Sequence, residues 1–467
     1  MTGPSGQHLF AVRGGIGLYF NRDSEEAQLQ NLEDPPFGTS SIGAGDVGGS
    51  PSFGNPFQDV ANRPGKSLPN KFPYTFPTPG QNIDFSQFTP YDLSTISPKY
   101  DVPYAFNLML QVQRQIPGSQ VLAIGYVGSL GRKLVRAYEA DRITPAGHAA
   151  AVALCATMSV SDCQSNVAST LPLTYPQFFT ESSGNFLSVG QVYTDGSSNY
   201  HSLQVSLTKQ MTHGLYYQIS YTYSHALDNG SSFESAGFGN SYDLVGTNWV
   251  PGFQNLSYGN SEFDSRNRFV AGYGYEIPLT AGMRDNYFMN EFMGGWHLTG
   301  VTALQSGNPV SIGDVGLNSS LYCNFPVPFY SCPDTPNTST YNIPRRNPRQ
   351  QIDGQNFWFD PSPFSPEPIG TFGNVKRNFF SGPGFNYTNM ALFENFPIGH
   401  ADSPRYIQLR LEAANVFNHA NFAPPDGFLG DGPSFGTITS VVQPVQDAGQ
   451  GDPQPGRAVQ LAGKFYF

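Results

Sequence analysis

Apolar and polar side chains alternate one by one along several segments of this chain, and this two-residue period is that of an extended β-strand. In residues 202–208, Leu203, Val205 and Leu207 alternate with side chains that are only Ser, Gln and Thr. Such a polar face suits a water-filled lumen better than a buried core, whereas the apolar face suits lipid. The pattern predicts a membrane-spanning strand with these three residues outward and Gln204 and Ser206 inward.

About ten segments carry the strand pattern, and short and long connections alternate between them. The expected strands are 8–20, 104–116, 119–135, 200–211, 215–227, 265–277, 294–306, 385–396, 405–417 and 457–467. The expected long loops are 21–102, 138–198, 228–264, 307–384 and 418–456. Short periplasmic turns and long extracellular loops are typical of outer-membrane barrels, so we predict an all-β, antiparallel transmembrane β-barrel meander. Residues 435–442 should then lie outside the membrane, and parallel strand pairing should be absent.

The composition favours the same fold class. Aromatic residues make up 14% of the chain and charged residues 13%, a balance that favours strands and loops over helices. No run approaches the roughly 18 apolar residues of a transmembrane helix. The net charge is −11, and the longest basic cluster is Arg345–Arg346 with Arg349, which argues against nucleic acid as a partner.

Four cysteines form two close pairs, Cys155 with Cys163 and Cys323 with Cys332. Neither pair is a CxxC motif, and no histidines flank them at the spacing of a zinc site. We predict two local disulfides, which stabilise loops in an oxidising compartment. The alternative is four unrelated free thiols.

The final stretch, Arg457 to Phe467, alternates strictly and ends on an aromatic residue. It resembles the C-terminal strand of bacterial outer-membrane β-barrels, whose aromatic end is read by the barrel assembly machinery. The resemblance implies that Phe465 and Phe467 are an assembly signal. The strand should pair with 405–417, and its other edge should be free or closed on 8–20. The alternative is an amphipathic edge strand of a soluble sheet.

A set of motifs resembles the TonB-dependent outer-membrane transporters, and more narrowly the Oar-like group with a carboxypeptidase-regulatory-like N-terminal domain. The motifs lie at 126–134, 199–229, 263–278, 294–312, 412–422 and in the terminal FYF. The resemblance covers nearly the whole chain and implies a location in the bacterial outer membrane. It implies as partners the outer-membrane lipid, the assembly machinery, TonB and an unknown extracellular solute.

The chain also departs from that family. Its transporters have about 22 strands, with a plug inside the barrel. No plug, TonB box or signal peptide is visible in this sequence. We therefore expect residues 1–467 to be the C-terminal portion of the barrel, with about half of its strands, and TonB to be contacted through a missing N-terminal part.

No enzyme motif is found, since HExxH, GxSxG and a P-loop are all missing. The glycine-rich match at 43–48 has no strand before it and no helix after it, so no catalytic residue, cofactor or metal is expected. The candidates for a substrate-facing loop surface, with a solvated loop as the alternative, are Arg345, Arg346, Arg349 and Trp358. We expect Glu412, Asn415 and Asn418 to order a strand end.

Two function classes follow from these observations. The first is import of a large solute across the outer membrane with energy passed through TonB. The second is a surface adhesin or structural protein with disulfide-clipped loops, and a weaker third is a secreted all-β carbohydrate-binding or hydrolytic protein. A plug and a TonB box encoded upstream in the same reading frame would select transport.

Overall fold

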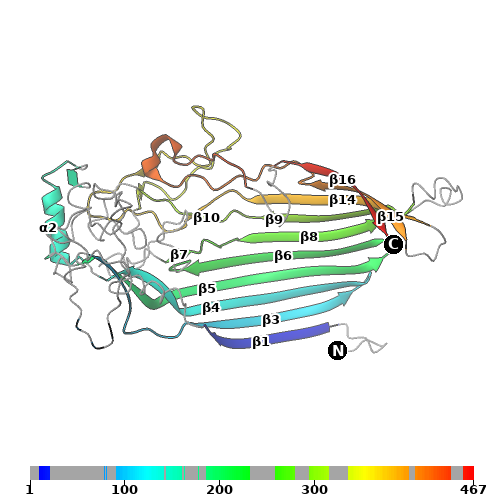
Figure 1. The fold of residues 1–467 in the computed structure, drawn as a ribbon, viewed down its shortest axis with the longest axis horizontal. Coiled ribbons are helices and arrows are strands. Elements are labelled where there is room, and N and C mark those ends of the chain that lie inside the picture. The colour runs from blue at the N-terminus through cyan, green and yellow to red at the C-terminus, as the bar shows by residue number, and fades with distance from the viewer. Residues whose placement is uncertain are drawn as a thin grey trace.

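A single antiparallel meander of ten strands dominates the computed structural model (Figure 1). The structure describes residues 10–21, 91–140, 143–159, 186–231, 258–278, 294–314, 335–398, 405–442 and 456–467, together with the isolated positions 78, 80, 82, 162–163 and 177. The strands, in sheet order, are β1 (Phe10–Phe20), β3 (Tyr104–Ile116), β4 (Gln120–Glu139), β5 (Phe186–Thr212), β6 (Leu215–Asp228), β8 (Asn267–Glu276), β9 (His297–Gln305), β14 (Phe385–Pro397), β15 (Tyr406–Ala414) and β16 (Ala458–Tyr466). The predicted all-β meander is confirmed.

The pairing register keeps the two kinds of side chain apart. Leu203 lies opposite Tyr126 on β4 and Tyr223 on β6, whereas its neighbour Gln204 lies opposite Thr222. Directly paired residues share a face of the sheet, and successive residues point to opposite faces. Followed from strand to strand, direct pairs place a row of mostly apolar residues on one face: Val12, Val112, Ile124, Val205, Tyr221, Phe269 and Leu304. Leu392, Leu411 and Leu461 continue this face on β14, β15 and β16.

The two ends of the sheet differ as predicted. The strand ends that short turns join lie at the end of the sheet where the C-terminus lies, and the strand ends that long connections join lie at the other end (Figure 1). The tightest turn joins β5 to β6 through His213 and Gly214, with φ angles of 54° and 77°. Positive φ at both positions suits a two-residue hairpin, because its twist matches that of the strands. The long-loop end is therefore the extracellular end.

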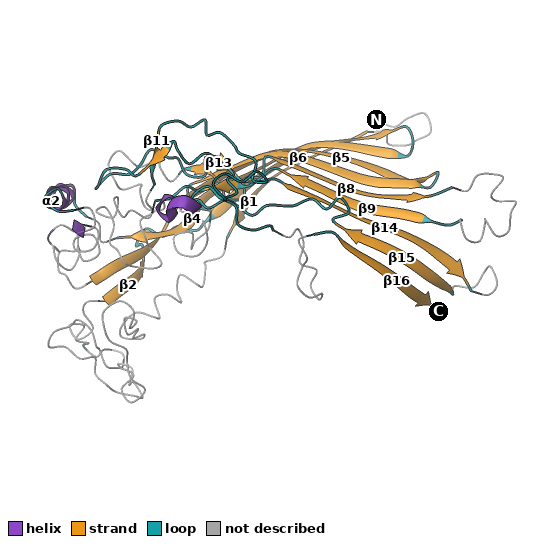
Figure 2. Cartoon of the chain, turned by 90° about the horizontal axis from the view of Figure 1, so that it is seen from above, coloured by secondary structure: helices purple, strands orange, loops and turns teal. Residues whose placement is uncertain are grey.

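The sheet is open in the described part of the chain. Its order runs from β1 at one edge to β16 at the other, and Figure 2 shows β5 to β16 fanning out in sequence. The predicted pairing of the last strand with β15 is confirmed, with Leu461 opposite Leu411. In lipid both edges need partners, because no water is present to hydrogen-bond them.

One prediction about pairing is wrong. A short strand, β2 (Tyr91–Ile96), pairs in parallel with the first part of β5. The strand β5 begins at Phe186 instead of near 200, and β6 covers it only from Ser198 onward. The uncovered edge of β5 is thus available to β2, and the long connection between them permits parallel pairing.

The connection from β4 to β5, expected as a plain loop, contains the helix α2 (Pro145–Cys155). Thr144 caps it by accepting a hydrogen bond from the Gly147 N–H at 3.0 Å, and Pro145 opens its first turn. None of the helices in the described part of the chain is long and apolar enough to cross a bilayer.

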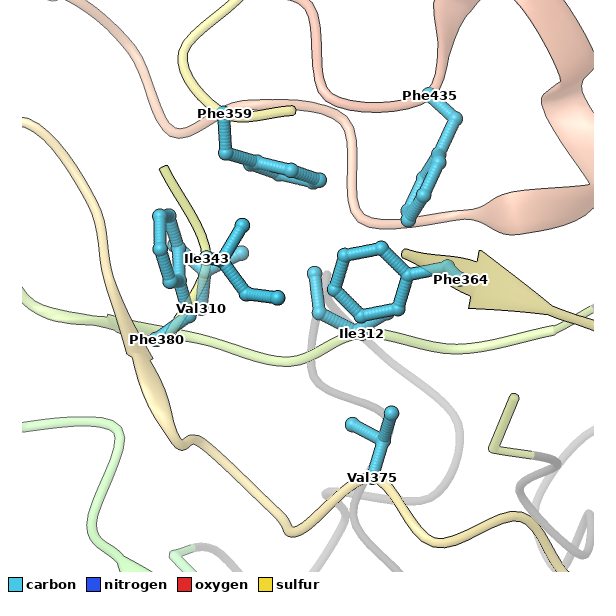
Figure 3. Close-up of a cluster of buried hydrophobic side chains, with 8 residues drawn as sticks. All are labelled: Val310, Ile312, Ile343, Phe359, Phe364, Val375, Phe380 and Phe435. Atoms are coloured by element: carbon cyan, nitrogen blue, oxygen red, sulfur yellow. The ribbon is translucent and has the colours of Figure 1, made fainter. Parts of the chain in front are cut away.

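The loop predicted at 307–384 folds together with residues after β15 into a unit with its own core. We name residues 307–314, 335–381 and 421–442 the outer arch. Its short strand pairs are β10 (Pro309–Val310) with β13 (Phe380–Ser381) and β11 (Asn337–Thr338) with β12 (Phe364–Ser365). The main cluster of its buried hydrophobic side chains, drawn in Figure 3, consists of Val310, Ile312, Ile343, Phe359, Phe364, Val375, Phe380 and Phe435.

Residues 435–442 lie in the outer arch, as predicted. They make only isolated bridges, at Thr437 with Phe357 and at Val441 with Phe422, and form no strand of the main sheet. A 3₁₀ helix, η6 (Leu429–Ser434), precedes them. Aromatic rings hold this part in place, since Phe435 and Phe359 lie 5.2 Å apart between ring centroids.

The two faces of β5 should respond differently to charge. Leu207 lies opposite Ile219, which pairs with Ala271 in the middle of β8, so Leu207→Arg in the intact protein should cost about 2–4 kcal/mol of stability. Ser206→Arg, on the wet face of the same strand, should stay within about 0.5 kcal/mol. Urea titration of the protein folded into lipid vesicles measures both. Equal losses would contradict the assignment of faces.

Candidate functional site

The polar face of the sheet surrounds a hollow of about 910 Å³. Residues from β5 through β16 line it, so the sheet curves around its polar face. The polar residues of this lining that belong to the lumen face are Thr208, Tyr216, Gln218, Thr299, Asn389, Arg410, Glu412 and Gln460. This wall offers hydrogen-bond donors and acceptors to water and to polar solutes.

The charged centre of this wall is the pair Arg410 and Glu412. The Arg410 Nε donates to the Glu412 Oε1, and the guanidinium lies 4.9 Å from the ring centroid of Phe393. Both residues share a face, because they are two positions apart on β15. A charged pair on this face stays in contact with water and avoids the cost of burial in an apolar core. The described residues contain no group of three or more His, Cys, Asp or Glu placed to hold a metal ion.

The outer arch is fastened to the outer end of the sheet by a buried ion pair. The Arg377 Nη1 lies 2.5 Å from the Asp228 Oδ1, and the Arg377 Nη2 donates to the Ser231 Oγ at 2.7 Å. Asn378 and Asn260 donate to each other's backbone carbonyl oxygens from their side-chain amides, both at 2.8 Å. We name these five residues the rim latch. It fixes the arch against the ends of β6 and β7 (Gly259–Asn260).

Sequence reasoning gave no role to the rim latch. Asp228 and Arg377 are 149 residues apart, and no local pattern links them. The one available signal was the low share of charged residues, which is 13%. A charged residue within an apolar stretch of such a chain is rarely buried without a partner of opposite charge.

The three predicted loop arginines each lie over an aromatic ring of the outer arch. The Arg345 guanidinium is 5.9 Å from the Trp358 ring centroid, and those of Arg346 and Arg349 are 5.7 and 5.9 Å from Phe357 and Phe422. The Trp358 Nε1 donates to a backbone carbonyl at 3.0 Å, and its ring packs on the arch core. The structure thus brings the four candidate residues into one folded unit.

Two carboxyl groups of the arch shift in opposite directions. Burial alone would raise the pKa of Asp360, but hydrogen bonds from Ser362 and the nearby Arg346 guanidinium outweigh it and lower the pKa. Burial raises the pKa of Asp426, and the Asp431 carboxylate adds to that rise. As the pH falls and the two carboxyl groups take up protons, the contribution of Asp360 to the stability of the folded protein decreases and that of Asp426 increases.

Of the three residues expected to order the end of β15, Asn415 and Asn418 do so, whereas Glu412 pairs with Arg410 on the lumen face. Asn415 and Asn418 adopt φ angles of 47° and 52°, a conformation that asparagine tolerates better than most residues. The Asn415 side chain bonds both the N–H and the carbonyl of His419 at 2.9 Å, and its own N–H donates to the Asn389 Oδ1. The Asn418 Oδ1 accepts from the Arg457 N–H, which positions the start of β16.

The first cysteine pair is bonded as predicted. Cys155 and Cys163 form a disulfide with their Cα atoms 5.1 Å apart, and it joins the end of α2 to the next turn of chain. The predicted partners Cys323 and Cys332 lie outside the described residues.

The two terminal aromatic residues are exposed on the apolar face. Phe465 is 57% and Phe467 is 93% exposed, and their ring centroids lie 5.8 Å apart. Their parity is that of Leu461, so both rings point to the lipid side. Their role as an assembly signal stays a prediction.

Removal of the buried cation of the rim latch should loosen the outer arch. Arg377→Met leaves Asp228 buried without its cation, which should cost about 3–5 kcal/mol. A second change, Asp228→Asn, should recover much of that loss. Arg349→Met, at an exposed arginine, is the matched control and should cost about 1 kcal/mol or less. Hydrogen exchange across 335–381 measures all three, and unchanged protection in Arg377→Met would contradict the latch.

Comparison with known families matches residues 6–460 to a family described as an outer membrane beta barrel domain. No curated protein gives a significant match. Among solved structures, the outer membrane transporter YddB from Escherichia coli is similar, with 10% sequence identity and a TM-score of 0.37. The likeness covers 80% of this chain and 34% of YddB, so the chain spans about a third of that protein's length.

Proposed function

The chain belongs to the outer membrane beta barrel domain family. On that premise we propose that it forms part of the barrel wall of a TonB-dependent transporter. It is a protein of the bacterial outer membrane, with the apolar face of its sheet toward lipid. The proposed activity is import of a large extracellular solute, driven by energy that passes through TonB.

The observation that carries the proposal is a wide hollow on the lumen face of the sheet, with hydrogen-bonding side chains in its wall and a folded arch at its outer end. The hollow of about 910 Å³ is lined by hydrogen-bonding side chains and by the Arg410–Glu412 pair. The rim latch holds the arch at the extracellular end of the same sheet. A solute from outside would meet the arch first and the polar wall second, which is the order that selective import requires.

The narrower assignment to the Oar-like group rests on the sequence motifs. The hairpin at 199–229 and the strand end at 412–422 form β5 with β6 and the end of β15 in this sheet. We propose that a plug and a TonB box are encoded upstream in the same reading frame. They would supply the contact with TonB and the gate inside the barrel.

The arginine and tryptophan cluster supports a substrate-facing surface on the arch. Arg345 and Arg349 are exposed, and aromatic rings hold their guanidinium groups in place. Arg346 is paired with Asp360 at 3.0 Å. A rigid surface with two exposed cations suits a solute that carries anionic groups.

Dependence on TonB can be tested in cells. The intact protein in its own outer membrane should cross-link to TonB on formaldehyde treatment, and the product should vanish in a strain without TonB. The arch variant Arg345→Ala with Arg349→Ala should keep the cross-link, since the arch lies at the opposite end of the sheet. An assembled protein that never cross-links, and whose loss weakens cell attachment, would be an adhesin instead.

The assembly role of the last residue can be tested separately. Deletion of Phe467 should lower the amount of protein in the outer membrane while synthesis stays unchanged, because the assembly machinery would lose its aromatic contact. Lys464→Ala, on the polar face of the same strand, should leave the level unchanged. Fractionation followed by immunoblotting measures both. Normal assembly of the deletion variant would show that Phe467 is only a strand end.

A further inference from the structure

A second hollow, of about 360 Å³, lies on the lipid-facing side of the sheet, at the outer ends of β8, β9 and β14 and beside the middle of β6. Its floor is a row of direct cross-strand neighbours, which are Tyr221, Phe269, Leu304 and Asn386. Ser306, Gly384 and His419 close its outer end. Because these residues pair directly, the row runs straight across the four strands. We name this hollow the outer notch.

Apart from Asn386, the floor of the outer notch is apolar and accessible. Leu304 is 40% exposed, and the ring of Phe269 lies beside it in the ladder. The Tyr221 hydroxyl donates to the Asn267 Oδ1 at 2.7 Å, so this ring has its polar end bonded and its apolar body in the floor. The hydroxyl lies at the extracellular side, as expected for a tyrosine near the membrane interface.

Two polar side chains of the outer notch keep their hydrogen-bonding groups available to a ligand. The backbone N–H of Asn386 donates to the Asn421 Oδ1 at 2.8 Å, and that of His419 donates to the Asn415 Oδ1 at 2.9 Å. Both backbones are therefore fixed. The Asn386 amide and the His419 imidazole make no side-chain hydrogen bond to any residue that the structure describes.

We propose that the outer notch binds one molecule of the outer-leaflet glycolipid. An acyl chain lies on the aromatic floor, and Asn386 and His419 hydrogen-bond the sugar or phosphate headgroup. Two facts select this occupant. The floor faces hydrocarbon, where acyl chains are the only solvent. The polar pair lies at the extracellular end of the strands, at the level of the outer-leaflet headgroups. The inference rests on the outer-membrane location and not on transport.

A photo-reactive phenylalanine tests the site in the intact protein. It replaces Phe269 in one variant and Tyr275 in the control, on the same strand and face but about 20 Å nearer the periplasm. The protein is extracted into detergent, separated from free lipid and then irradiated. Position 269 should yield a glycolipid adduct, detected by mass and by a sugar stain, and position 275 should not.

Substitution of Asn386 and His419 distinguishes glycolipid bound at a specific site from lipid that is merely carried over in the detergent. Asn386→Leu with His419→Leu should lower the adduct at position 269 about ten-fold, because two hydrogen bonds are lost. Gln204→Leu, on the wet face, should leave it unchanged. Native mass spectrometry of the unsubstituted protein should show one retained glycolipid. Equal adducts at both positions, a protein adduct at 269, or no effect of the double change would overturn the proposal.

Discussion

The whole sheet depends on one constraint, which is that backbone N–H and C=O groups in lipid have no partners except one another. Ten strands satisfy it by pairing in chain order. A slip of one residue would exchange the faces of a strand, so the register has to stay in phase from β1 to β16. The register shifts in this meander fall in the outer part of β4, at Arg132–Arg136, and at the periplasmic end of β5, at Lys209–Thr212. The lipid-facing stretch between them is continuous.

Beyond the membrane the constraint is relaxed, because water can satisfy the backbone. The outer arch accordingly has little regular structure and relies on its own aromatic core, with Phe359, Phe364 and Phe435 at its centre. Its attachment relies on charge. Burial of Arg377 and Asp228 costs desolvation free energy, and their contact with additional hydrogen bonds offsets that cost. Such a pair determines where the arch lies more than how stable it is.

One alternating pattern thus serves two environments. The residues of one parity form a wet wall with Arg410 and Glu412, and those of the other parity contact lipid. At the outer end of the sheet the two environments meet. There the rim latch positions the arch, while the outer notch lies on the lipid side of the same strands.

The sequence by itself determined the strands, their faces and the end that carries the long loops, because the two-residue period is a local property of each strand. It also determined that Arg345, Arg346, Arg349 and Trp358 lie near one another, since they are neighbours in the chain. Only the tertiary structure decided the parallel strand β2, the arch core and the contact of Arg377 with Asp228. These join segments far apart in the chain, and they form where folding leaves an open strand edge, an uncovered ring or a buried charge in need of a partner.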